Sequence, residues 1–109
     1  MFGHFEKVCK AYPKSAQNHN SLAWLAVCCR RQLDKALEHS KKAVELAPKT
    51  AGYLDTLAEV YYQRGDKAQA IKLMKKCIEL NPASTYYKKQ IKRFEAPGPP
   101  SETPRTSES

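Results

Sequence analysis

Residues 51–84 read AGYLDTLAEVYYQRGDKAQAIKLMKKCIELNPAS. Between positions 74 and 80 the apolar residues recur at the spacing of one helix face, and Pro82 ends that helix because it lacks a backbone donor. Gly65 and Asp66 divide the stretch, since glycine tolerates a positive φ and aspartate is a favoured helix N-cap. The stretch is therefore predicted to form two helices joined by a short turn.

The same pattern returns along the chain. Prolines fall at Pro13, Pro48 and Pro82, and a similar apolar stretch precedes each of them. A Leu-x-x-Leu-Ala pattern occurs at positions 22–26 and again at 54–58, which is an offset of 32 residues rather than 34. The two missing residues must come from the turn after the first of these helices. That turn has no glycine and is predicted to be tight or strained.

This repeat resembles the tetratricopeptide repeat family. Residues 51–84 carry its packing residues and closing proline at Leu54, Leu57, Ala58, Tyr61, Gly65, Ala70, Met74, Cys77, Leu80 and Pro82. The resemblance covers residues 1–95 and divides them into a half repeat (1–13), two repeats (17–50 and 51–84) and a capping helix (84–95). It implies an all-α, right-handed solenoid of antiparallel helix pairs, cut from the C-terminal part of a repeat array.

We expect six helices, near 1–12, 19–31, 33–46, 51–63, 67–80 and 84–95. The last has one apolar stripe and one strongly charged face, which suits a terminal cap buried on one side only. Residues 96–109 have no large apolar side chain and are predicted to be disordered, as a spacer or as a docking tail.

The composition excludes several classes of protein. The 109 residues suffice for one small domain. There is no apolar run long enough for a membrane span and no signal peptide, so the sequence predicts a cytoplasmic protein or a piece of a longer one. The cysteines have no C-x-x-C spacing, and the histidines share no helical face. No enzyme activity, metal site or cofactor is expected.

The resemblance implies that the first helices of the repeats line a concave face that binds another protein or peptide. The residues expected on that face are Asn20, Trp24, Asp55, Thr56, Glu59 and Tyr62. Asp55 and Glu59 could instead be a catalytic pair or plain solvated surface. As binding residues, they would favour a partner segment with a basic residue.

Two predictions concern particular side chains. Trp24 either anchors a partner in the groove or packs on residues 15–18, which precede its helix. In the core, Leu57, Ala58, Tyr61 and Ala70 should be buried, with no room for a larger side chain at Ala58.

The net charge of +8 supports an alternative function. A basic surface could bind nucleic acid or another polyanion through the lysine-rich second helices and the cap. Its residues would be Lys75, Lys76, Lys88, Lys89, Lys92 and Arg93. A solvated convex face is the simpler interpretation, because no aromatic residues are interleaved for base stacking.

The N-terminal half repeat lacks its partner helix. Phe2 and Phe5 would then be partly uncovered, which forgoes burial. Either the chain continues a longer array, or two copies pair through this edge, or the helix frays.

Overall fold

The computed structural model describes residues 15–29 and 32–98, and these form five helices. The helices are α2 (Ala16–Cys29), α3 (Leu33–Leu46), α4 (Ala51–Gln63), α5 (Lys67–Leu80) and α6 (Thr85–Glu95). No described residue lies in a strand. The ends of these helices agree with five of the six predicted helices to within three residues. The predicted helix near 1–12, with Phe2 and Phe5, lies outside the described residues.

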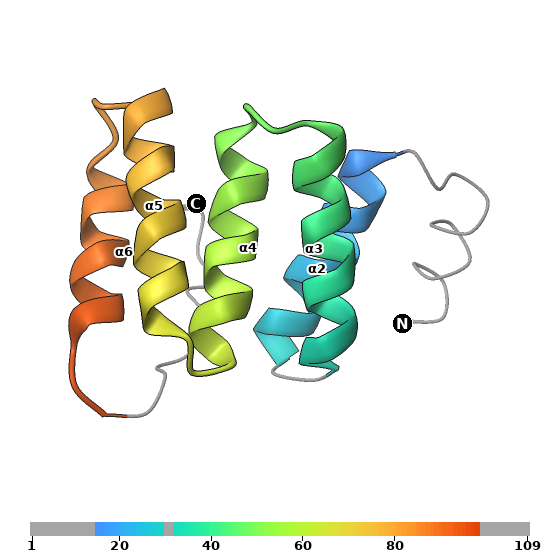
Figure 1. Ribbon diagram of the computed structural model, residues 1–109, viewed down its shortest axis with the longest axis horizontal. Helices are drawn as coiled ribbons and strands as arrows, with labels where there is room; N and C mark the ends of the chain where they lie inside the picture. Colours follow the sequence, from blue (N-terminus) through green and yellow to red (C-terminus); the bar gives the residue numbers. More distant parts are fainter. Residues whose placement is uncertain (1–14, 30–31, 99–109) are drawn as a thin grey trace.

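Helices α3, α4, α5 and α6 stand side by side in Figure 1, and α2 lies behind α3 in this view. α2 packs mainly against α3, and α4 against α5, while α6 packs on α5. The described part of the chain is thus an all-α helical repeat, as predicted. None of its helices has both the length and the hydropathy needed to cross a membrane.

Local signals set the turns between the helices. Gly65 has a φ of 92°, and the Asp66 carboxylate accepts a hydrogen bond from the Gln69 backbone N–H at 3.2 Å, which caps α5. The turn before α3 lacks a glycine, and Gln32 there adopts a left-handed backbone with a φ of 52°. That conformation is costly for a residue with a Cβ atom, so the predicted strain is present.

The core consists of two clusters that share helix α4. One joins Leu54, Ala58, Ala70, Met74, Cys77 and Phe94. The other joins Ala23, Ala26, Val27, Ala36 and Val60. Ala26 is thus buried as Ala58 is, which confirms the 32-residue offset between α2 and α4.

The predicted burial of Leu57, Ala58 and Ala70 is confirmed, but the prediction for Tyr61 is wrong. Tyr61 is only half-buried, whereas its neighbour Tyr62 is 2% exposed. The reason is α6, which places Phe94 against Tyr62 with ring centroids 4.5 Å apart.

Two histidines that the sequence separates by 20 residues come together. His19 of α2 is buried, and its ring stacks on that of His39 of α3 with centroids 5.0 Å apart. Their Nδ1 atoms are 2.8 Å apart, which is a hydrogen bond. The sequence analysis did not predict this contact, because the packing of α2 on α3 places the two histidines on facing surfaces.

The first residues of the predicted tail contact α5. The Lys67 ammonium donates to the carbonyl oxygens of Ala96 and Gly98, at 2.6 and 3.0 Å. The disorder of residues 96–109 stays a prediction. Residues 99–109 lie outside the described part.

Replacing Ala58 with leucine tests the core. Ala58 is fully buried, so the larger side chain should cost about 1–3 kcal/mol of unfolding free energy through strain. Urea unfolding followed by circular dichroism measures this cost. Ala68→Leu, at an exposed position of α5, is the control and should change little. Equal stabilities for the two variants would contradict the packing of α4.

Candidate functional site

A pocket of about 430 Å³ opens between α2, α4 and α6. One side is lined by Asn20 and Trp24 of α2 and by Gly52, Asp55 and Thr56 of α4. Residues three or four positions apart lie on one face of a helix, which explains why these side chains point the same way. Trp24 also packs against the core cluster shared by α2 and α3, so its ring is half-buried.

The other side of the pocket comes from the C-terminal end of the fold. It is lined by Asn81 and Ser84 of the turn after α5, and by Tyr86 and Tyr87 of α6. The two tyrosine rings meet edge to face, with centroids 5.7 Å apart. The backbones of α4 and α6 approach each other less closely than those of consecutive helices, which leaves room for the pocket.

The pocket brings together four of the six residues expected on the concave face: Asn20, Trp24, Asp55 and Thr56. Asp55 and Thr56 are both buried, and the Thr56 hydroxyl donates to the Gly52 carbonyl at 3.1 Å. The Asn20 Oδ1 atom is buried and has no hydrogen-bond partner within the described part of the chain.

Glu59 does not line the pocket, contrary to the prediction. It is 2% exposed, and Arg93 of α6 donates to both its oxygens at 2.7 Å each. Gln63 donates to the same carboxylate at 2.9 Å. Such a bidentate pair is strong and directional, so Glu59 joins α4 to α6 and is not available to a partner.

The same contact changes the expected locations of Tyr62 and Arg93. Tyr62 is buried and lies under the Arg93 guanidinium. The Cζ atom of Arg93 is 4.6 Å from the centroid of the Tyr62 ring. The Arg93 side chain is only 17% exposed. It was predicted on the polyanion surface, but its hydrogen bonds go to Glu59 and Gln90 and it points away from solvent. The offset of 34 between Glu59 and Arg93 places them at equivalent positions of successive repeats.

Comparison with known families supports this repeat. Residues 51–84 match the sequence profile of the family described as Tetratricopeptide repeat. This stretch, which covers α4 and α5, is therefore similar to a tetratricopeptide repeat. A comparison with curated proteins found no match.

Asp55 is the acidic residue among the side chains that line the pocket. Burial, followed by the negative charge of Glu59, raises its pKa from 3.8 to about 7, although Tyr86 donates a hydrogen bond to it and Arg93 is nearby. Burial, then Asp55, likewise raises the pKa of the Cys77 thiol to about 12 and that of Tyr86 further above its ordinary value. Thiol and phenol therefore stay neutral at neutral pH, whereas the Asp55 carboxyl group gains or loses its charge at a pH of about 7.

The groups that act on Asp55 are the Tyr86 hydroxyl, the Glu59 carboxylate and the Arg93 guanidinium. Among the described residues, no three His, Cys, Asp or Glu side chains gather as a metal site would require.

Sequence reasoning missed the α6 side of the pocket. The apolar stripe that the sequence analysis gives to the capping helix contains Tyr86 and Tyr87, and neither was expected at a binding site. The 34-residue offset was the available signal, because it relates Gly52 to Tyr86 and Tyr53 to Tyr87. It would have placed α6 on the same face as α4.

Removing Arg93 should strongly destabilise the fold. Arg93→Gln leaves the Glu59 charge buried without its cation, which typically costs about 3–5 kcal/mol. Urea unfolding measures the change. Lys92→Gln, at an exposed neighbouring position, should stay within about 0.5 kcal/mol. A similar small loss for both variants would show that the ion pair is not needed.

The raised pKa of Asp55 makes stability depend on pH. The folded chain keeps a proton that the unfolded chain releases above its ordinary pKa of 3.8. The unfolding free energy should therefore fall as pH rises from about 4 to about 7 and level off above that. In Asp55→Asn this fall should be smaller by roughly 1–3 kcal/mol between pH 5 and pH 8. Urea unfolding at both pH values tests this, with Glu79→Gln as the exposed control.

Proposed function

We propose that the chain is a non-enzymatic interaction module that binds a segment of another protein in the pocket between α2, α4 and α6. Tetratricopeptide repeats form protein–protein interaction scaffolds, and the family match supports this class of function. A cytoplasmic location is part of the proposal.

The observation that carries the proposal is the pocket itself. Its volume of about 430 Å³ lies in the range of sites that bind ligands. Its walls combine three aromatic residues with a few polar groups, and such residues dominate the energetics of protein interfaces. Three successive first helices contribute to it, so a bound segment would contact every described repeat unit.

Filling the pocket tests this function. A Cβ atom added at Gly52 meets nothing within 4 Å, so Gly52→Tyr should place a ring in the pocket without disturbing the helix. Ala68→Tyr adds the same ring to an exposed position of α5. Proteins bound by the parent chain and by Ala68→Tyr should bind Gly52→Tyr at least about tenfold more weakly. The same affinity for all three would place the binding surface elsewhere.

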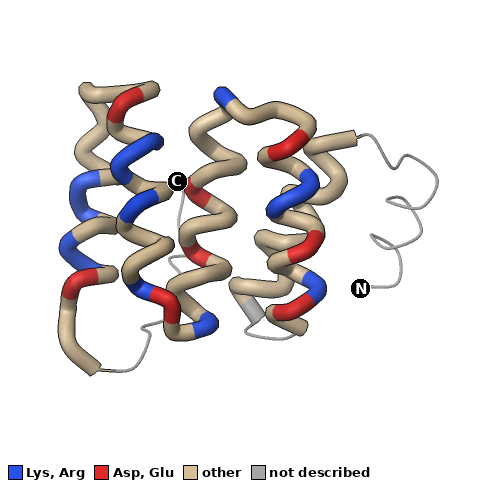
Figure 2. Tube along the Cα trace, viewed as in Figure 1, with Lys and Arg blue, Asp and Glu red and all other residues tan. Residues whose placement is uncertain are grey.

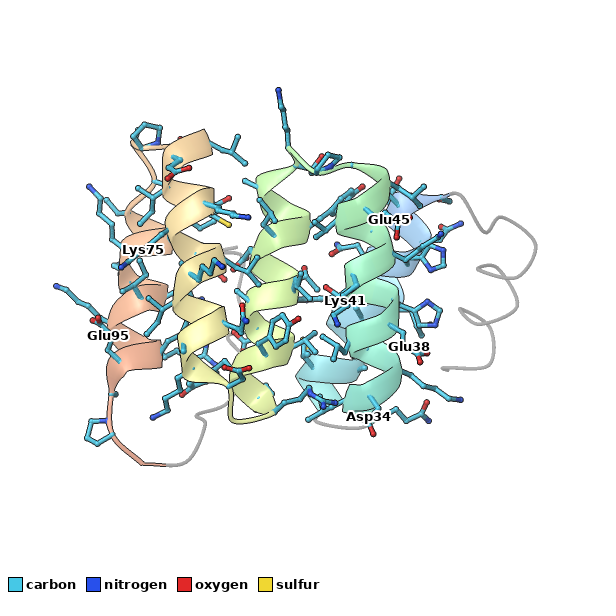
Figure 3. All side chains as sticks on the ribbon, viewed as in Figure 1. Asp34, Glu38, Lys41, Glu45, Lys75 and Glu95 are labelled. Atoms are coloured by element: carbon cyan, nitrogen blue, oxygen red, sulfur yellow. The ribbon has the colours of Figure 1, made fainter. Side chains whose placement is uncertain are left out.

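A second candidate function uses the basic surface. Lys75, Lys76, Lys88, Lys89 and Lys92 are exposed on α5 and α6, and the Lys and Arg residues of these two helices lie near one another in Figure 2. The surface does not continue over α3, where Asp34, Glu38 and Glu45 interrupt it (Figure 3).

Binding of a labelled oligonucleotide at low and high salt tests this second candidate. Contacts with phosphates weaken steeply as salt rises. Replacing Lys88, Lys89 and Lys92 with glutamine should then reduce the binding. Lack of binding at low salt would exclude this function.

A further inference from the structure

We infer that the pocket takes a lysine side chain of the partner, with its ammonium against Asp55 and its methylene stem along the aromatic walls. This inference rests on the proposed function and names the chemistry of the bound group. The sequence analysis expects a partner segment with a basic residue, and this inference specifies that the residue is a lysine.

The charge of the pocket points to a cation. Asp55 is the acidic side chain of the lining, and it is 92% buried, since 8% of it is exposed. Arg93 acts on Asp55 through its charge, but its hydrogen bonds of 2.7 to 2.8 Å go to Glu59 and Gln90. A buried carboxylate without its own counter-charge is costly, and a cation from a partner would remove that cost.

The pocket also offers neutral groups that suit an ammonium. The Asn20 Oδ1 atom is buried without a hydrogen-bond partner in the described structure, and it can accept from one of the three N–H donors of a lysine. Trp24, Tyr86 and Tyr87 supply apolar walls for the stem. Aromatic rings beside a carboxylate are a favourable environment for an alkylammonium.

Lysine fits better than arginine because of how Asp55 is held. The Tyr86 hydroxyl donates to the Asp55 carboxylate, which occupies part of its acceptor capacity. A guanidinium gains most from a carboxylate with both oxygens free for a bidentate contact, whereas an ammonium is a compact charge that needs only one. Glu59 accepts such a bidentate contact from Arg93. Asp55 has fewer acceptor positions for one, because Tyr86 already donates to it.

Trp24 provides the readout, because it is the only tryptophan of the chain and lines the pocket. Its fluorescence is followed while the full chain is titrated with Nα-acetyl-lysine amide. Nα-acetyl-norleucine amide has the same stem without the ammonium, and Nα-acetyl-arginine amide carries the guanidinium. We expect saturable binding of the lysine compound, at least about tenfold tighter than that of norleucine, and weaker binding of arginine than of lysine.

Asp55→Asn should reduce the affinity for the lysine compound to that of norleucine, while the exposed Glu79→Gln variant should bind as the parent does. Circular dichroism establishes that both variants are folded. The inference is overturned if lysine gives no saturable signal, if norleucine or arginine binds as tightly, or if Asp55→Asn binds as the parent does.

This experiment is separate from the test of the proposed function. If Gly52→Tyr blocks a protein partner but the lysine compound does not bind, the interaction module stands and the lysine pocket is wrong. If the lysine compound binds but no protein depends on the open pocket, the lysine pocket stands and the proposed function fails.

Discussion

The ion pair between Glu59 and Arg93 connects the last helix to the repeat before it. α6 packs on α5, and its backbone approaches α4 less closely. The guanidinium crosses that gap with two bonds of 2.7 Å to Glu59 and rests on the Tyr62 ring. Phe94 packs beside it against the same tyrosine. A charged, bidentate contact flanked by aromatic rings therefore sets how α6 lies against α4.

The same contact determines what is left for a ligand. Because Glu59 already holds a cation, the acidic character of this face is reduced to Asp55. The separation of α4 and α6 that Arg93 bridges continues toward Asp55, Tyr86 and Tyr87 as the pocket. The two neighbouring carboxylates of α4 thus differ in role. Glu59 holds α6 through its ion pair, and Asp55 lines the pocket.

Much of the fold could be predicted because its signals are local. Pro48, Pro82 and the Gly65-Asp66 pair act within a few residues of where they stand, so the helix ends follow from the sequence. The repeat register then placed Asn20, Trp24, Asp55 and Thr56 on one face, and the structure brings them together.

The remaining features depend on contacts between distant segments. The burial of Tyr62 instead of Tyr61, and of Glu59, depends on Arg93 and Phe94, which follow more than thirty residues later. Helical periodicity along α4 cannot show which of its polar residues meets a partner on α6. The sequence analysis also treats α6 as a cap and not as the first helix of a further repeat. For that reason Tyr86 and Tyr87 are not part of the predicted site.

The contact between His19 and His39 makes two like residues chemically different. A bond between two Nδ1 atoms 2.8 Å apart holds a single proton, so one imidazole donates from Nδ1 while the other accepts there. The accepting ring must then be the neutral tautomer that carries its hydrogen on Nε2. While both rings are neutral, the accepting ring has a donor at Nε2 and the donating ring has an acceptor there, so the two rings offer different hydrogen-bonding edges where α2 meets α3.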